Sequence, residues 1–426
     1  VCRDAGVPVI ARGAGTGLSG GALPRADGVL LSLARLNKIL DVDLANCRAR
    51  VQPGVRNLAI SEAAKPFGLY YAPDPSSQIA CSIGGNVAEN AGGVHCLKYG
   101  LTVHNLLALQ VVTIDGELIT IGGGGLDAPG YDLLALMTGS EGMLGVVVEV
   151  TVKLLPIPER AQVALAAFDD IDKAGQAVAD VIAAGIVPAG LEMMDNPAIR
   201  AAEGFAHAGY PTDAAAILLC EVDGSNAEVS EDIQRVRELL LASGAAEVRT
   251  AASDAERALF WAGRKAAFPA VGRISPDYYC MDGTIPRKHL AKVLKEIGRM
   301  ADKYGLGVAN VFHAGDGNLH PLILFDANKP GELEKAEEFG GRILELSVAV
   351  GGTITGEHGV GLEKINQMCA QFNHEEISVF HAVKAAFDPA GLLNPGKNIP
   401  TLARCAEFGA MHVHDNQLPH PELPRF

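Results

Sequence analysis

The sequence predicts an α+β protein with a glycine-rich first domain and a second domain of strand–helix–strand units. Three observations indicate this fold class. Between 7 and 154, short β-rich stretches alternate with glycine clusters. Pro156 and Pro158 then interrupt the chain, and closely spaced prolines mark a boundary between structural units. Beyond this boundary, apolar β-branched stretches alternate with longer segments of helical periodicity.

In the first domain we expect strands wherever a short run is rich in β-branched and aliphatic residues. These strands are predicted at 7–11, 29–33, 48–51, 107–114, 118–121 and 146–154. The Asp115-Gly116 pair between two of them is a strong signal for a hairpin turn, because such turns need positive φ angles.

The second domain is predicted to contain two successive strand–helix–strand units. Their segments are strand 163–167, helix 172–184 and strand 191–194, then strand 216–222, helix 230–242 and strand 247–250. Two such units in succession indicate a ferredoxin-like sheet with helices on one face. A third stretch runs from a strand at 280–285 through a helix at 287–304 into a histidine-bearing segment.

The composition supports a globular protein and argues against several classes of partner. The chain has 426 residues, is 48% hydrophobic and carries a formal net charge of -15. Nucleic acid and anionic lipid both require a basic face, so neither is expected as a direct partner. No apolar run approaches the ~20 residues that span a bilayer, and no signal peptide opens the chain. We therefore expect a cytoplasmic protein that reaches a membrane only through a partner.

The eight cysteines contain no CxxC pair, so neither an iron-sulfur cluster nor a zinc ribbon is indicated. Their pattern is typical of buried or free thiols in a reducing compartment. The chain opens with Val1, and its first residues have the pattern of a helix end running into a strand. We expect further residues to precede them in the natural protein.

The segment FHAGDGNLH at 312–320 places His313 and His320 at the two ends of a turn of small and polar residues. Apolar stretches flank the segment on both sides, which predicts a hairpin with one histidine at each strand end. The two imidazole rings can then meet. Further on, TGEHGVG at 355–361 offers Glu357 and His358 on a second glycine-bounded turn.

Two histidines and one carboxylate form a common metal-binding set. We therefore predict a divalent metal site on His313, His320 and Glu357, with zinc favoured by ligand type and manganese or iron also compatible. Any histidine pair taken alone is more often hydrogen-bonded near a loop than bound to metal. The bare Gly-Asp-Gly-Asn turn and the glycine beside the Glu-His pair favour a metal or substrate site here.

The first glycine cluster, RGAGTGLSGGA at 12–22, formally matches GxGxxG through Gly15, Gly17 and Gly20. A dinucleotide-binding turn of that kind leads directly into a helix. Here the cluster is followed by Pro24 and a predicted strand, so we reject a nicotinamide site. No GxxxxGK[ST] motif occurs either. The remaining interpretation is a nest of backbone N–H groups that wraps a diphosphate without a helix dipole.

Two further glycine clusters have the same character. They lie at 73–93 and at 138–147, and the first of them reads as a loop without secondary structure. Loops longer than about 12 to 15 residues are usually functional. Three such segments in one domain indicate one large, extended ligand.

Six segments occur in the order seen in one known family: RGAGTGLSGGA, PDPSSQIACSIGGNVAENAGG, TGSEGMLG, FHAGDGNLH, GEHGVG and FDPAGLLNPGKNIP. Over nearly its whole length the chain resembles the FAD-linked D-2-hydroxyacid dehydrogenases of the vanillyl-alcohol oxidase superfamily. Residues 261–287 are most similar to the glycolate oxidase type within that family.

The resemblance implies a two-domain vanillyl-alcohol-oxidase-like flavoprotein. It places an FAD-binding domain, N-terminally incomplete, at 1–155 and a ferredoxin-like cap domain for substrate and metal at 156–375. A segment at 376–400 is then expected to pack back toward the flavin, ahead of a tail at 401–426. FAD is expected without a covalent link, because the first glycine cluster has no His or Cys. The expected cofactor-binding residues are Arg12, Gly13, Ala14, Gly15, Thr16, Gly17, Pro75, Ser76, Ser82, Gly84, Gly85, Asn86, Asn90, Gly92, Glu141, Gly145, Val147 and Asn394.

The family implies oxidation of a 2-hydroxy acid, with hydride passing to the flavin because side chains cannot accept it. On this basis His358 is the expected base and Arg264 the expected bidentate partner of the substrate carboxylate. From spacing alone, Arg264 would be interpreted as a residue that forms a surface salt bridge. Two other classes stay open: a metal-dependent hydrolase with the same ligands, and a non-catalytic flavin-binding subunit.

Relatives that oxidise D-2-hydroxyglutarate carry a threonine and a lysine for the distal carboxylate, at positions that align here with Phe268 and Cys280. An apolar ring and a thiol cannot pair a buried carboxylate. We therefore expect a small substrate such as glycolate or D-lactate, unless both residues belong to the core. The resemblance also implies other subunits of a glycolate oxidase complex, an iron-sulfur subunit among them, and peripheral inner-membrane association through those partners.

Overall fold

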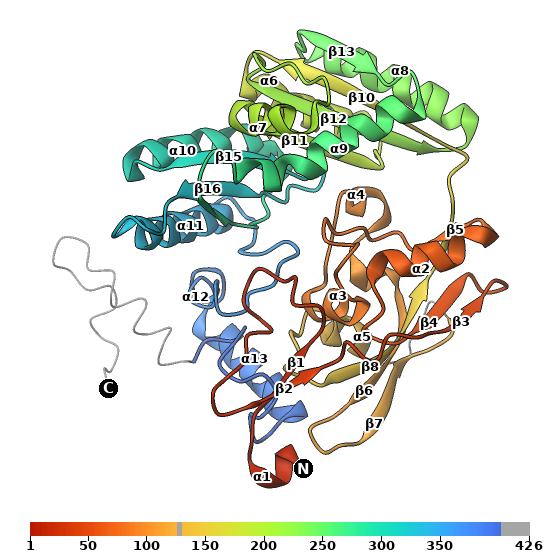
Figure 1. The fold of residues 1–426 in the computed structure, drawn as a ribbon, viewed down its shortest axis with the longest axis vertical. Helices are drawn as coiled ribbons and strands as arrows, with labels where there is room; N and C mark the ends of the chain where they lie inside the picture. The colour runs from red at the N-terminus through yellow and green to blue at the C-terminus, as the bar shows by residue number, and fades with distance from the viewer. Residues whose placement is uncertain (126–129, 402–426) are drawn as a thin grey trace.

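The computed structural model describes residues 1–125 and 130–401, which form two lobes (Figure 1). Residues up to about Pro156 form one lobe, and the chain from Arg160 to the end of the second sheet forms the other. The predicted tail at 401–426 lies, apart from Thr401, outside the described residues. No helix among the described residues is both long and apolar enough to cross a membrane.

The first lobe is built on a five-stranded antiparallel sheet. Its strands, in spatial order, are β3 (Ile39–Asp43), β4 (Arg48–Val51), β8 (Val146–Lys153), β6 (Leu106–Val112) and β7 (Leu118–Gly122). All but β3 were predicted within two residues. The short elements around this sheet are α1 (Cys2–Ala5), α2 (Asn57–Ala64), η1 (Lys65–Phe67), β5 (Leu69–Tyr70), α3 (Ile83–Glu89), α4 (Cys96–Tyr99), η2 (Thr102–Asn105), α5 (Leu133–Met137) and β9 (Leu155–Pro156).

The second glycine cluster is not the irregular loop that its composition predicts, because α3 lies inside it. Ser82 caps this helix by accepting a hydrogen bond from the backbone N–H of Gly85. Its glycines allow close packing: a Cβ on Gly84 would lie 2.5 Å from the Cβ of Pro53. The first cluster does lack a helix, as predicted, and runs from β1 (Val9–Arg12) to β2 (Val29–Ser32).

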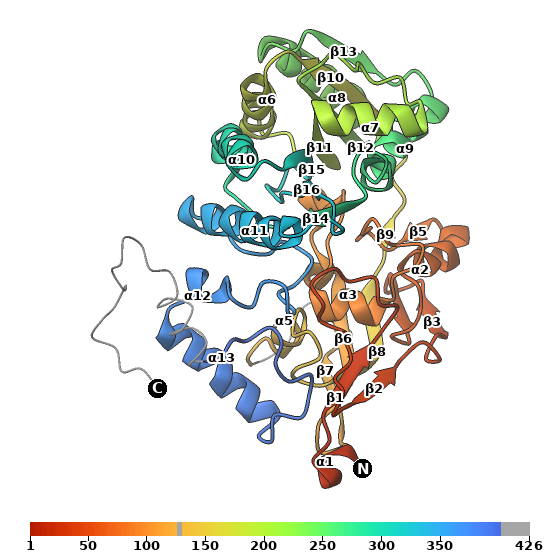
Figure 2. The same ribbon diagram turned by 60° about the vertical axis from the view of Figure 1, so that its left-hand side comes forward.

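The C-terminal part of the described chain returns to the first lobe. Strands β1 and β2 pair in parallel, and Leu393 forms a bridge with Val9 beside them. Helix α13 (His374–Phe387) contributes Val383 and Phe387 to the core under the first sheet. Both views show this helix next to the N-terminal strands (Figures 1 and 2).

The second lobe contains a seven-stranded sheet. In spatial order its strands are β13 (Glu247–Thr250), β10 (Arg160–Phe168), β12 (Ala216–Gly224), β11 (Gly190–Asp195), β15 (Gly307–Phe312), β16 (Pro321–Phe325) and β14 (Asp277–Cys280). Its first four strands have the antiparallel order of the predicted ferredoxin-like unit. The later strands extend that unit sideways, and the histidine hairpin is part of the extension.

Helices cover both faces of this sheet: the helices predicted at 172–184, 230–242 and 287–304 lie on one face, and helices that were not predicted cover the other. Alternate residues of β10 belong to two different cores: Ala166 and Phe168 face one side, Val163 and Leu165 the other. The first face carries α6 (Ile171–Ala183), α8 (Asn226–Ala242), α10 (Leu290–Tyr304, after η3, Arg287–His289) and α11 (Glu332–Ala349), and the second carries α7 (Asn196–Ala206) and α9 (Asp254–Val271). The short α12 (Met368–Gln371) precedes α13.

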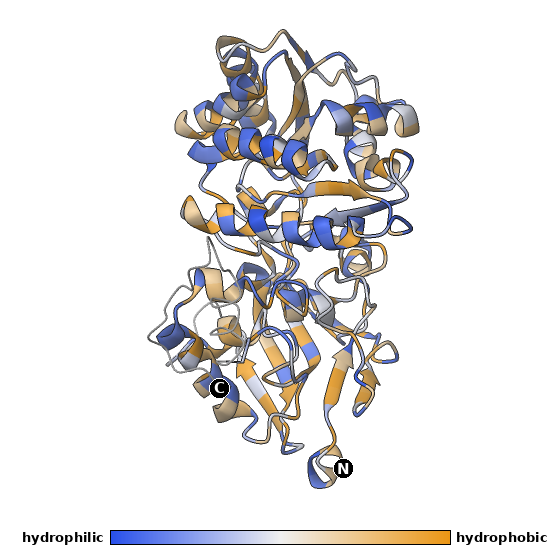
Figure 3. Cartoon of the chain, turned by 90° about the vertical axis from the view of Figure 1, so that its left-hand side faces the viewer, coloured by the Kyte–Doolittle hydropathy of each residue, from blue (hydrophilic) through white to orange (hydrophobic). Residues whose placement is uncertain are grey.

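The distribution of hydropathy explains why both faces are covered. The central strands β10, β12 and β11 are buried along most of their length, whereas several helices show mixed hydrophilic and hydrophobic surfaces (Figure 3). Burial on both sides gives a strand a continuous apolar run instead of alternation. Strand β10 is such a run from Val163 to Phe168.

The predicted histidine hairpin is formed by β15 and β16, which pair antiparallel. Its turn is closed by the N–H of His313, which donates to the carbonyl of Asn318 at 3.1 Å, and by the N–H of Gly317, which donates to that of His313 at 3.1 Å. Gly317 has a φ of 84°. A Cβ there would lie 2.1 Å from the carbonyl oxygen of Ile285.

Gly317→Ala should therefore lower the free energy of unfolding by more than about 2 kcal/mol, since it adds a backbone clash to left-handed strain of about 1–2 kcal/mol. Gly305→Ala is the matched control, because Gly305 has a φ of +67° with nothing within 4 Å of its added Cβ. Denaturant unfolding of both variants measures the difference. Equal losses of stability would show that the contact with Ile285 is unimportant.

Candidate active site

The two hairpin histidines meet, as predicted. His313 follows β15 and His320 precedes β16, and their side chains are almost completely buried. Their ring centroids lie 5.1 Å apart with an interplanar angle of 86°. Edge-to-face packing directs the Nε2 atoms of both rings toward the same neighbour, which is Glu357.

Glu357 reaches the histidines from the turn at 355–361. Its Oε1 lies 3.0 Å from the Nε2 of His320 and 3.4 Å from that of His313. One donor atom from each of the three residues lies within 4.8 Å of the others. Gly92 permits this approach, because a Cβ on it would lie 2.6 Å from Oε2 of Glu357. The three residues predicted as metal ligands therefore converge.

Burial and neighbouring charges shift the pKa values of Glu357 and His313 in opposite directions. Burial alone raises the pKa of Glu357, but hydrogen bonds from His313 and His320 outweigh it and hold the pKa well below its usual range. Burial lowers the pKa of His313, while the Glu192 and Glu357 carboxylates outweigh this and raise it well above its usual value. These shifts favour an anionic Glu357 carboxylate paired with a protonated His313, so a metal ion would have to displace that proton to bind here.

Residues behind His313 orient its ring. Glu192, on β11, has Oε1 at 2.8 Å from His313 Nδ1 and Oε2 at 2.6 Å from Arg264 Nη2. A carboxylate on Nδ1 fixes the tautomer and leaves Nε2 as a ligand atom. Arg264 is 2% exposed and pairs with Glu192 behind the histidine. Nε and Nη2 of Arg264 make no hydrogen bond among the described residues, so the predicted grip on a substrate carboxylate stays a prediction.

The turn that carries Glu357 and His358 is held by Asp282, a residue that the sequence analysis did not single out. The carboxylate of Asp282 is completely buried and accepts the backbone N–H groups of Gly356, Glu357 and His358. Lys364 Nζ lies 3.4 Å from its Oδ2. Burial alone raises the pKa of Asp282, but Lys364 and the nearby imidazoles outweigh it and lower the pKa.

His358 lies beside the metal-ligand cluster. Its ring stacks on that of His320 with centroids 5.0 Å apart. Its Nδ1 is 3.4 Å from Asp282 Oδ2, and its Nε2 is 3.9 Å from Glu357 Oε1. Burial lowers the pKa of His358 to about 4, against the raising effect of Asp282. A neutral ring with Nδ1 facing a carboxylate leaves Nε2 free to accept a proton.

His320, Glu357 and His358 line a cavity of about 560 Å³. The three glycine clusters of the first lobe line the rest of it. Of the predicted cofactor-binding residues, the following line the cavity: Arg12, Gly13, Ala14, Gly15, Thr16, Gly17, Pro75, Ser76, Ser82, Gly84, Gly85, Asn86, Glu141, Gly145 and Val147. The structure therefore brings together segments that lie far apart in the sequence.

Three predicted cofactor residues are absent from this lining among the described residues: Asn90, Gly92 and Asn394. Asn90 ends α3 with a φ of 53° and accepts the N–H of Val103. Asn394 donates to the carbonyls of Gly21 and Glu141. Their contact with the cofactor stays a prediction.

The cap side of the cavity is formed by α9. Phe268, Lys265 and Pro269 line it, together with His320, Glu357 and His358. The ring of Phe268 packs edge-on against His320 with centroids 6.0 Å apart. Cys280, the other predicted pocket residue, is 7% exposed and lies behind His320 instead of in the described lining.

Sequence reasoning missed Glu192, Asp282 and Lys364, although two of them carry a signal. Glu192 is a lone carboxylate in the apolar strand LEMM, and Asp282 lies two residues after the end of β14 and precedes a glycine. A charged residue is rarely buried unless it is paired. Neither signal names the partner, which comes from a distant part of the chain.

Comparison with known proteins agrees with this arrangement. Residues 1–122 match the family described as FAD binding domain, and residues 157–398 match FAD linked oxidases, C-terminal domain. The chain is 72% identical to the glycolate oxidase subunit GlcD of Escherichia coli, over all of this chain and 85% of that protein. It is 42% identical to the Bacillus subtilis protein of the same name, over 95% of this chain and 86% of that protein. A D-lactate dehydrogenase of Anaerostipes hadrus is 33% identical, over 93% of this chain and 85% of that protein.

Solved structures share the fold. A 4-ethylphenol oxidase from Gulosibacter chungangensis has a TM-score of 0.76 at 19% identity, over 94% of this chain and 86% of that one. A p-cresol methylhydroxylase has a TM-score of 0.76 at 16% identity, with the same coverage. The predicted two-domain flavoprotein fold is confirmed. Since both halves of the chain match its families, and the glycine clusters meet in one cavity, the chain belongs to the FAD-linked oxidases.

Proposed function

We propose that this chain oxidises a small 2-hydroxy acid such as glycolate or D-lactate to the 2-oxo acid, with FAD and a divalent metal. Its family and its relatives support FAD-dependent oxidation of 2-hydroxy acids. The observation that carries the finer proposal is the convergence of His313, His320 and Glu357, of which the last two line the glycine-rich cavity together with His358. A metal-dependent hydrolase would leave that cavity without a ligand.

The residues of the cavity fit a non-covalently bound FAD, which supplies a hydride acceptor when bound. Gly13 lies close to α3, since a Cβ on it would be 2.2 Å from Ser82 Oγ. Glu89 lines the cavity, and its buried Oε2 has no hydrogen-bond partner among the described residues. A polar group of the cofactor would satisfy this oxygen.

Two nitrogen ligands and one oxygen ligand fit a zinc, manganese or iron ion, which supplies Lewis acidity to a bound hydroxyl. His313, His320 and Glu357 would hold it. Nε2 of His358 would take the hydroxyl proton, and the Asp282 carboxylate, 3.4 Å from Nδ1, would stabilise the positive charge of the protonated ring. Lys265, which lines the cavity beside Phe268, would pair with the carboxylate in the role first assigned to Arg264.

We further propose that electrons leave through other subunits of a glycolate oxidase complex, including an iron-sulfur subunit, or to a quinone. The Escherichia coli and Bacillus subtilis relatives are named as subunits. The sequence contains no CxxC pair with which to carry electrons itself. A cytoplasmic location with peripheral membrane association through those partners would follow.

FAD should dissociate on acid precipitation, because the first glycine cluster offers no side chain for a covalent link. Gly17→Val should reduce the FAD content while leaving the melting temperature of the apoprotein unchanged. An added Cβ there meets only Glu89 Oε1, at 3.9 Å, and projects into the cavity. Gly123→Val is the control outside the cavity, with open space around its Cβ. Flavin colour that stays in the acid pellet would contradict a non-covalent link.

His320→Ala should abolish both bound metal and turnover while FAD remains, because the glycine clusters come from the other lobe. Metal analysis and the flavin absorption spectrum of the purified variant measure these outcomes. His374→Ala, at an exposed histidine of α13, should change neither. A His320 variant that retained metal and activity would refute the ligand assignment.

Glycolate or D-lactate should be oxidised at least ~10³-fold more efficiently than D-2-hydroxyglutarate, because Phe268 cannot pair a distal carboxylate. The comparison is kcat/KM for each acid in the assembled enzyme. Anaerobic flavin reduction with D- and L-2-hydroxy acids gives the stereochemical preference independently of the acceptor. Efficient turnover of the dicarboxylate would refute this account of the pocket.

A further inference from the structure

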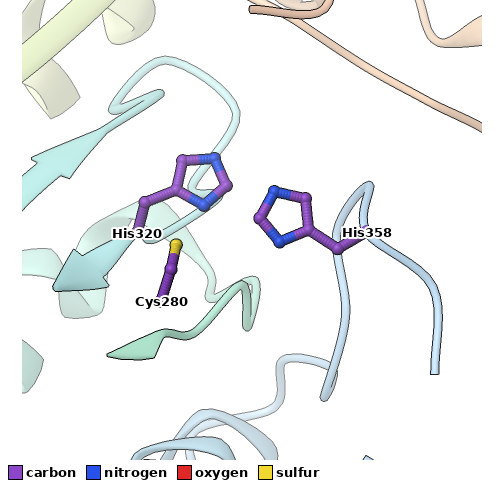
Figure 4. Close-up of side chains that lie close together, drawn as sticks. All are labelled: Cys280, His320 and His358. Atoms are coloured by element: carbon purple, nitrogen blue, oxygen red, sulfur yellow. The ribbon is translucent and has the colours of Figure 1, made fainter. Parts of the chain in front are cut away.

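A second group of metal-binding side chains overlaps the first. Cys280 ends β14, and its Sγ lies close to His320 and His358 (Figure 4). One ligand atom from each of the three residues lies within 4.8 Å of the others, as in the first group. His320 therefore belongs to both groups, and the second one replaces a carboxylate oxygen by sulfur.

We propose that Cys280, His320 and His358 form an inhibitory site for soft metal ions such as Cd²⁺. The inhibitory part rests on the proposed function, because it assigns the substrate proton to His358; the binding part does not. Cys280 is buried, and its Sγ donates weakly to the carbonyl of Met281 at 3.5 Å. This hydrogen bond is much weaker than a metal–sulfur bond, so it does not prevent Sγ from binding a metal ion.

The two sites should select different ions. A thiolate with two imidazoles favours soft and borderline ions, whereas two imidazoles with a carboxylate also accept manganese and iron. On binding Cd²⁺ the S–H bond of Cys280 breaks, a Cd–S bond forms and the proton leaves to solvent, with no change of oxidation state. An unprotonated ring nitrogen of His320 and of His358 completes the set.

Occupation of this site would stop oxidation in two ways. His320 would bind the ion of the second site and would hold the metal of the first site less well. His358 would use a ring nitrogen as a ligand and could no longer take a proton there. Both rings line the cavity, so the ion would enter by the route of the substrate. Bound substrate should therefore slow inhibition.

The test is a Cd²⁺ titration of the FAD-loaded, zinc-loaded enzyme. Ultraviolet thiolate-to-cadmium charge-transfer absorption and equilibrium dialysis report binding, and single-turnover flavin reduction by glycolate reports inhibition. Cys280→Ala should lose the charge-transfer band and weaken Cd²⁺ binding by roughly tenfold or more, since one of three ligands is removed. Cys280→Ser, which keeps the volume but not the soft sulfur, should behave in the same way and guards against misfolding of the alanine variant.

Two free thiols serve as matched controls. Cys220 is fully buried in β12 of the same lobe, and Cys47 is half-buried in the other. Cys220→Ala and Cys47→Ala should keep the charge-transfer band and the inhibition. A band that survives in both Cys280 variants, or disappears in either control, overturns the proposed site.

The two proposals fail differently. If no 2-hydroxy acid reduces the flavin, the proposed function falls, while the charge-transfer band still decides whether Cys280 binds Cd²⁺. If glycolate reduces the flavin but Cd²⁺ gives neither band nor inhibition, only the second site is refuted.

Discussion

The site depends on one buried carboxylate. Asp282 accepts three consecutive backbone N–H groups, those of Gly356, Glu357 and His358, with Lys364 as its counter-ion. An unpaired charge at this depth would cost several kcal/mol, so the lysine and the hydrogen bonds are both required. Because Asp282 fixes the backbone of two adjacent residues, it sets the positions of one proposed metal ligand and of the proposed base together.

A second carboxylate joins this turn to the other lobe. Glu141, in the first lobe, accepts the N–H groups of Val360 and Gly361 and a hydrogen bond from Asn398. The glycines allow the close approach, as a Cβ on Gly361 would lie 2.1 Å from the carbonyl oxygen of Ser19. The turn at 355–361 is thus attached to the wall of the cofactor cavity, which explains how groups from two lobes keep a fixed separation.

The lobes also meet away from the cavity, through His95. Its Nδ1 lies 2.8 Å from Asp74 in the first lobe, and its Nε2 lies 3.4 Å from Glu221 in the second, which also accepts two hydrogen bonds from Arg257. Burial lowers the pKa of His95, but the two carboxylates outweigh it and raise the pKa to about 10. A folded-state pKa above the usual 6.5 means that this contact stabilises the protein fully below about pH 6.5 and is lost as the pH rises toward 10.

The sequence by itself determined the local elements and the types of chemistry. Hydrophobic periodicity gave most strands and the helices α6, α8 and α10, and the turn residues gave the hairpin that brings His313 to His320. Only the tertiary structure decided which charged residues lie behind the histidines and Glu357, because the pairing of buried charges depends on elements distant in sequence. Arg264 is the clearest case: the family resemblance implies a carboxylate grip and spacing alone a surface salt bridge, yet α9 places the side chain in the interior beside Glu192. Likewise Cys280 appears beside His320 and His358 only once β14 pairs with β16.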